Sequence, residues 1–260
     1  MTLPIIVLIA IVAGLAAAGA IWLVLNGPAR GPRSADRFVI PGAAFLVAAA
    51  IVGGALYTLT RGASGDGAER KVLEAIQRHH PEAAGEIAAI RSETNPALAQ
   101  KRASDLAQRY LPRHIPTTSD AAVVRFTSET TKVFESLAER DPESCKALAT
   151  GGAASATFDP AAMKPALDAM AQVVDDSVDA PQPPPQPLRA QQLLAGVVER
   201  VYAKPGDLAP PQMLTQPATV PAAQLCRTMI AFYREILNLP PADASQVLRT
   251  LMRSGQQPRR

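Results

Sequence analysis

The two cysteines are the side chains of this sequence best placed for covalent chemistry with each other. Cys145 and Cys226 form no Cys-x-x-Cys pair and lack the spacing of a metal site. Each lies on the apolar stripe of an expected helix, so both side chains should point into a core. An even number of cysteines in an exported body favours a Cys145–Cys226 disulfide. The alternative is two buried, reduced thiols in a cytoplasmic domain.

The histidines do not have the spacing of a metal site. His79 and His80 are adjacent, so on a helix their side chains point about 100° apart and cannot converge as an i, i+4 pair does. The sequence places them at the end of an expected helix, where we expect solvated side chains; the third histidine is His114. We predict no metal site and no bound cofactor.

Hydroxyl and carboxyl groups also lack a catalytic pattern. Ser64 lies between glycines, but the second glycine comes one residue too early for a nucleophile elbow, and no strand precedes it. The acidic cluster within 175–179 lacks the ligand pattern of a calcium loop. Glu135 and Glu139 recur at helical spacing, whereas a glycosidase needs two carboxylates across a cleft. We therefore predict no catalytic residue.

The chain that carries these residues begins with an expected transmembrane hairpin over 1–60. Its spans, 3–25 and 38–60, are each 23 residues long without a charged side chain. A helix of that length reaches roughly 34 Å, enough to cross a hydrocarbon core of about 30 Å. The first span is alternatively a signal peptide that is cut at Ala18-Gly19-Ala20. However, no Lys or Arg precedes this apolar run, and the run continues past that site.

Two features favour an extracytoplasmic position for the remainder of the chain. The link over 26–37 carries three Arg, so the positive-inside rule places it in the cytoplasm and both hairpin ends across the membrane. The expected disulfide needs an oxidising compartment. Abundant Arg and Ala are typical of a GC-rich bacterial genome, which makes that compartment the periplasm, bounded by the inner membrane. Basic residues that follow the second span favour the opposite orientation: Arg61, Arg70, Lys71 and Arg78.

A flexible tether is expected over 61–67, followed by an all-helical soluble domain over 68–260. Helix-forming Ala, Leu, Gln, Glu and Arg dominate this part, and no segment alternates polar and apolar residues. The predicted fold class is all-α: a two-helix transmembrane hairpin followed by an irregular helical bundle. The expected helices cover 68–80, 82–93, 96–111, 119–140, 142–150, 160–179, 188–203, 221–238 and 241–253.

A proline-rich segment over 181–187 divides the helical body. Such a segment favours an extended polyproline II conformation. It is either a linker between domains or an arm that crosses the surface of one domain. We predict a connector within one domain, because only about 70 residues follow it, which is marginal for an independent core. Recognition by a proline-reading partner is a further alternative.

Three functional hypotheses fit these features. The first is a membrane-anchored interaction or structural protein that contacts the lipid bilayer and an envelope protein partner. The second is an envelope enzyme, a hydrolase with an unrecognised carboxylate site. The third is a cytoplasmic-facing membrane regulator with reduced cysteines. We favour the first, and we expect no nucleic-acid partner, because lysines and arginines outnumber acidic residues only 26 to 23.

Overall fold

The computed structural model describes residues 68–150 and 160–254, and within these ranges the chain is helical without a strand. The all-α prediction is therefore confirmed for these residues. The predicted spans 3–25 and 38–60 and the tether 61–67 lie outside the described residues. In the part of the chain that is described, no helix is both long and apolar enough to cross a bilayer.

The α-helices lie close to the ranges expected from the sequence, and within 68–150 and 160–254 four short 3-10 helices accompany them. The α-helices are α3 (Ala68–His79), α4 (Ala84–Ser92), α5 (Pro96–His114), α6 (Asp120–Arg140), α7 (Pro142–Ala149), α8 (Pro160–Asp179), α9 (Pro187–Ala203), α10 (Ala222–Leu237) and α11 (Pro241–Ser254). The 3-10 helices are η1 (Pro81–Ala83), η2 (Ile115–Thr117), η3 (Pro211–Thr215) and η4 (Pro217–Thr219).

Side-chain caps fix the start of α6 and of α7. The Ser119 hydroxyl accepts a hydrogen bond from Ala122 N at 3.1 Å, which satisfies a free N–H at the start of α6. The Asp141 carboxylate accepts one from Ser144 N at 3.1 Å and caps α7. Pro142 is the first residue of α7, a position where its missing N–H costs little. These boundaries are where the sequence predicts them.

Helix α5 continues beyond its predicted end at residue 111, although it contains Pro112. A proline removes one hydrogen bond of the helix and normally disfavours the turn before it. Here the turns on both sides are held by packing, because Leu111 and Ile115 are both buried in the core. The three additional residues bring His114 to the end of the bundle.

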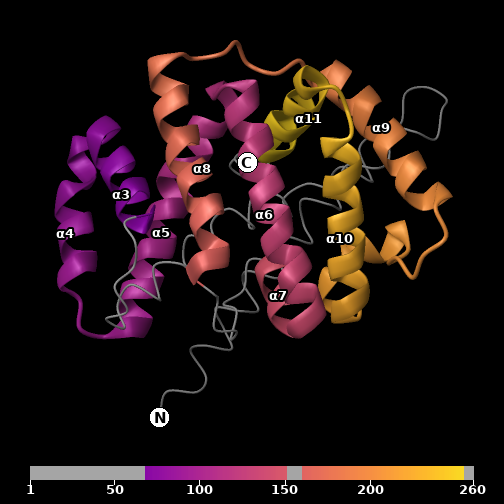
Figure 1. The fold of residues 1–260 in the computed structure, drawn as a ribbon, viewed down its shortest axis with the longest axis horizontal. Helices are drawn as coiled ribbons and strands as arrows, with labels where there is room; N and C mark the ends of the chain where they lie inside the picture. The colour runs from indigo at the N-terminus through magenta and orange to yellow at the C-terminus, as the bar shows by residue number, and fades with distance from the viewer. Residues whose placement is uncertain (1–67, 151–159, 255–260) are drawn as a thin grey trace, which may run out of the picture.

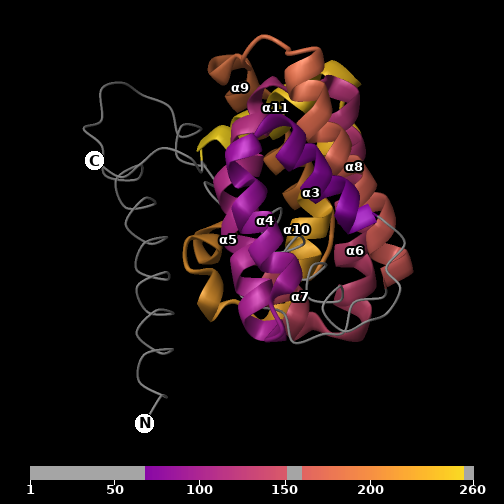
Figure 2. The same ribbon diagram turned by 90° about the vertical axis from the view of Figure 1, so that its left-hand side faces the viewer.

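Helix α6 lies at the centre of the bundle and packs against α7, α8, α10 and α11. On one side, α8 connects it to the layer formed by α3, α4 and α5 (Figure 1). On the other side lie α10, α11 and α9. Figure 2 shows the layer of α3, α4 and α5 from the front, with α8 beside α3. Segments from both sides of the proline-rich connector therefore meet on α6.

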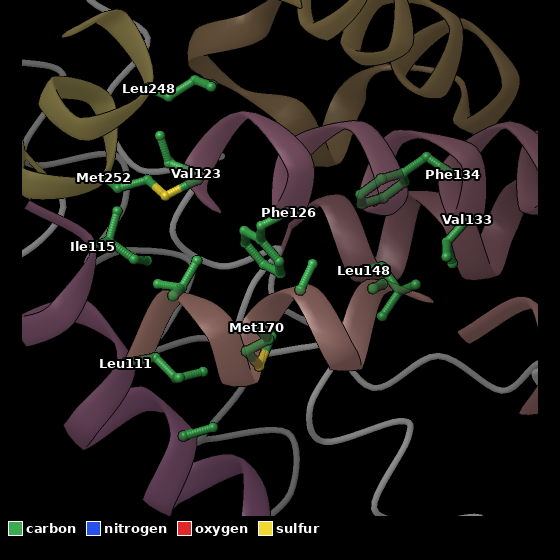
Figure 3. Packing of buried hydrophobic residues seen from close by; sticks show 14 of the residues in the cluster. Leu111, Ile115, Val123, Phe126, Val133, Phe134, Leu148, Met170, Leu248 and Met252 are labelled. Carbon is green, nitrogen blue, oxygen red and sulfur yellow. The ribbon is translucent and has the colours of Figure 1, made fainter. Parts of the chain in front are cut away.

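One hydrophobic cluster joins these helices into a common core. Figure 3 shows how side chains of α6 face those of α7, α8, α11 and η2. Phe126 and Phe134 project from α6, Met170 comes from α8, and Leu248 and Met252 come from α11. The cluster contains residues from before and after the connector.

The proline-rich connector runs across one end of the bundle from α8 to α9 (Figure 1). Hydrogen bonds join it to the bundle. Gln182 N donates to Thr117 O at 2.7 Å. Gln186 N donates to the side chain of Gln246 at 2.8 Å. Between them, Arg249 donates to Pro183 O at 3.4 Å. These hydrogen bonds hold the segment against η2 and α11.

Candidate functional site

All three histidines meet at one end of the bundle. His79 ends α3, His80 follows it, and His114 ends α5, opposite the last turns of α8. The His79 and His80 side chains are only 10% and 17% exposed. The expectation of a solvated helix end is therefore wrong: helix packing covers both rings, and His80 stacks on Tyr110 with ring centroids 4.5 Å apart.

A chain of hydrogen bonds runs from a buried hydroxyl to an exposed carboxylate through two imidazole rings. Ser177 Oγ lies 2.6 Å from His114 Nδ1. His114 Nε2 lies 2.9 Å from His80 Nε2. His80 Nδ1 lies 3.1 Å from Glu82 Oε1. Residues far apart in the sequence, from α5, α8 and η1, thus form one continuous polar path.

With His114 neutral and Glu82 ionised, counting hydrogens along this path gives two complete arrangements. In the first, the Ser177 hydroxyl donates to Val174 O, which lies 2.7 Å away. His114 Nδ1 then donates to Ser177, His80 Nε2 donates to His114, and a doubly protonated His80 donates to Glu82. In the second, the hydroxyl donates to His114, both rings are neutral, and every hydrogen points toward Glu82. The arrangements differ by one proton, so the path can hold one additional proton.

Burial keeps His114 neutral within this path. Desolvation lowers the pKa of His114 from 6.5 to about 4, and the charges of His80, His79 and Arg113 act in the same direction. Glu82 at the exposed end is stabilised as a carboxylate. Its pKa is lowered by the hydrogen bond from its own backbone N–H and by the one from His80.

His79 connects the histidines to an open groove between α3, α6 and α8. Asp175 Oδ1 lies 3.0 Å from His79 Nε2 and 2.6 Å from Arg78 Nη1. Asp176 accepts a hydrogen bond from the Ser119 hydroxyl at 2.5 Å. These contacts occupy the two carboxylates of the acidic cluster that face the bundle. Among the described residues, no group of three or more His, Cys, Asp or Glu is arranged to hold a metal.

The groove has a volume of about 510 Å³ and a mixed lining of opposite charges. Lys71 donates to Asp168 at 2.7 Å, and Lys164 donates to the same carboxylate at 3.1 Å. Burial raises the pKa of Asp168, but the hydrogen bonds from the two lysines outweigh it, and the net shift is downward. The groove is lined by Lys71, Glu74, Arg78, Arg125, Asp168, Ala171, Gln172, Asp175 and Asp176.

The structure joins the two cysteines that the sequence pairs. Cys145 on α7 and Cys226 on α10 form a disulfide with an S–S distance of 2.12 Å and a Cα–Cα distance of 6.2 Å. Both residues are fully buried. The bond links helices from before and after the connector, across a sequence separation of 81.

The serine of the histidine path is not placed as a nucleophile. Ser177 is buried, and its hydroxyl is engaged with His114 and Val174 O. The carboxylates also differ from those of a hydrolase acid, which needs a raised pKa. Asp168 and Glu235 both have lowered pKa values; in Glu235 the hydrogen bond from Lys204 is the main cause.

The sequence analysis did not predict that Ser177 contacts His114 or that Asp175 contacts His79. The available signal was the position of His79 at the end of the expected helix 68–80 and of His114 three residues after the expected helix 96–111, each close to a proline residue. Comparison with protein-family models, with curated proteins and with solved structures gave no match for this chain.

Proposed function

We propose that this chain is a membrane-anchored interaction protein of the bacterial envelope. The hairpin over 1–60 holds it in the inner membrane, and the helical bundle lies on the periplasmic side. The bundle acts by binding another envelope protein. The observation that carries this proposal is the buried Cys145–Cys226 disulfide, because structural disulfides persist in oxidising compartments.

The position of the disulfide suits a body that must persist outside the cytoplasm. Closing a loop of that length stabilises a fold by roughly 4 kcal/mol in the chain-entropy model. Because Cys145 precedes the connector and Cys226 follows it, the bond links α7 covalently to α10. Two uncharged spans and a link with three Arg are consistent with the same orientation.

The hydrolase and the cytoplasmic regulator each require a particular state of named side chains. A hydrolase needs an accessible carboxyl group with a raised pKa, whereas Asp168 in the groove has a lowered pKa and is paired with lysines. A cytoplasmic regulator needs Cys145 and Cys226 to be thiols in the cell. The redox state of the two cysteines therefore separates the first and third hypotheses directly.

The test is the redox state of the full chain in intact bacterial cells. Cells are quenched in acid, the protein is denatured, and free thiols are modified with a maleimide-polyethylene glycol, with and without prior reduction. We expect a gel shift from two modified thiols only after reduction. A Cys226→Ser variant is the control and should shift once without reduction. In parallel, protease added to spheroplasts should digest the bundle.

The opposite outcome is equally clear. Two modified thiols without reduction, together with a bundle that is digested only after lysis, would place the body in the cytoplasm and remove the proposal.

A further inference from the structure

The connector between α8 and α9 displays one face of prolines to solvent. A polyproline II helix has three residues per turn, so positions three apart share a face. Pro181, Pro184 and Pro187 are all exposed, whereas Gln182 is half-buried and Pro185 is buried. Burial therefore recurs every three residues: Gln182 and Pro185 lie against the bundle, and the three exposed prolines face solvent.

The backbone of this segment is already ordered. Its hydrogen bonds at Gln182 N, Pro183 O and Gln186 N tie it to η2 and α11. Gln186 has an extended conformation with φ −86° and ψ 105°. The exposed prolines thus span about 19 Å at roughly 3.1 Å per residue. A partner that binds them has little conformational entropy to remove.

Apolar side chains flank both ends of the proline face. Val178, in the last turn of α8, is 48% exposed. Leu188, in the first turn of α9, is 76% exposed, the largest value among the exposed large hydrophobic residues of the described chain. Together with the exposed prolines, they place apolar side chains on the solvent-exposed surface of this segment.

We propose that this surface, formed by the side chains of Val178, Pro181, Pro184, Pro187 and Leu188, is the docking site for a protein domain that reads polyproline segments through a groove lined with aromatic side chains. The inference rests on the proposed interaction function and names the class of partner. Aromatic grooves bind successive exposed prolines at Pro-x-x-Pro spacing, which this segment has twice, at 181–184 and 184–187. Leu188 adds an apolar contact at the end of the groove.

The test titrates the full-length chain, in lipid nanodiscs, into three purified probes: an SH3 domain, a WW domain and an EVH1 domain, each labelled with ¹⁵N. We expect saturable chemical-shift changes at the aromatic groove of at least one domain. Pro184→Ala, on the exposed face, should weaken that binding at least tenfold. Pro183→Ala is the matched control, because this exposed proline lies off the face, and binding should remain within twofold.

Circular dichroism melting shows whether each variant keeps its fold, so a loss of binding is not confused with unfolding. Absence of saturable binding by all three domains at millimolar concentration overturns the proposal, as does an equal loss in Pro183→Ala and Pro184→Ala. Self-association of the chain that Pro184→Ala abolishes also overturns it, because the occupant is then a second copy. The thiol and protease tests are independent, so either proposal can fail alone.

Discussion

The histidine path predicts that the stability of the bundle falls as pH is lowered below neutrality. In the unfolded chain His114 takes up a proton near its ordinary pKa of 6.5, whereas in the bundle burial lowers this pKa to about 4. Between these values the unfolded state binds more protons, so acidification favours unfolding. The stabilisation is complete above pH 6.5 and is lost as pH falls toward 4.

The magnitude follows from the size of the shift. From pH 6.5 to pH 5 the cost for one site is at most about 2 kcal/mol, at about 1.4 kcal/mol per pH unit. Relaxation of the bundle and entry of water around a protonated ring reduce this to roughly 1 kcal/mol. The groups facing His114 are His80, His79, Arg113 and Asp175, and only Asp175 acts to raise its pKa.

The assay is urea unfolding of the full chain in detergent micelles at pH 7 and pH 5, followed by far-UV circular dichroism. Replacing His114 by Gln removes the titrating group, so the loss of stability between the two pH values should shrink by roughly 1 kcal/mol. Ser177→Ala is the control: it removes one hydrogen bond of the path but keeps the rings. It should lower stability at both pH values by about 1 kcal/mol and preserve the pH dependence. An unchanged pH dependence in His114→Gln would show that groups other than His114 cause the loss of stability in acid.

Three further perturbations probe the disulfide, the core and the connector. Cys226→Ser should lower the free energy of unfolding by about 4 kcal/mol, and adding reductant to the wild-type chain should reproduce most of this loss in the same urea experiment. Phe134→Ala should cost about 3 to 5 kcal/mol, measured as a lower thermal midpoint, because Phe134 is 1% exposed at the centre of the bundle. Arg249→Met should cost roughly 2 kcal/mol and expose the connector to limited proteolysis, since Pro183 O and Thr118 O both lose their donor.

Local signals account for the accuracy of the predicted helices. Ser119 and the Asp141-Pro142 pair act on neighbouring backbone groups, so their effect on helix ends can be read without knowing the fold. The apolar stripe of α10 is likewise set by helical spacing, and it correctly places Cys226 in the core. Two inward-facing cysteines can form a disulfide only if their helices pack together. The structure contains the Cys145–Cys226 bond that the sequence favours.

Contacts between distant elements account for the errors. His80 looks like a solvated residue because nothing near it in the sequence covers it. Its cover comes from Tyr110 and His114, which α5 brings from about 30 positions away. The same holds for Ser177, whose partner His114 is 63 positions away. The polar path therefore depends on how α3, α5 and α8 pack, and no spacing along the chain reports that packing.

For Arg249, the spacing of residues along α11 predicts burial of the side chain but not its hydrogen-bond partners. Ser245, Leu248 and Met252 share the buried face of α11, and Arg249 lies on that face four positions after Ser245, with only 2% exposure. Spacing alone could thus predict a buried arginine, and burial of a charge requires polar partners. It could not identify those partners, which are Asp120 at 2.5 Å and the backbone of the connector. The hydrogen bond from Arg249 to Pro183 O helps to fix which edge of the connector faces the bundle. The Pro-x-x-Pro spacing can therefore be read from the sequence. Which prolines face solvent depends on the fold.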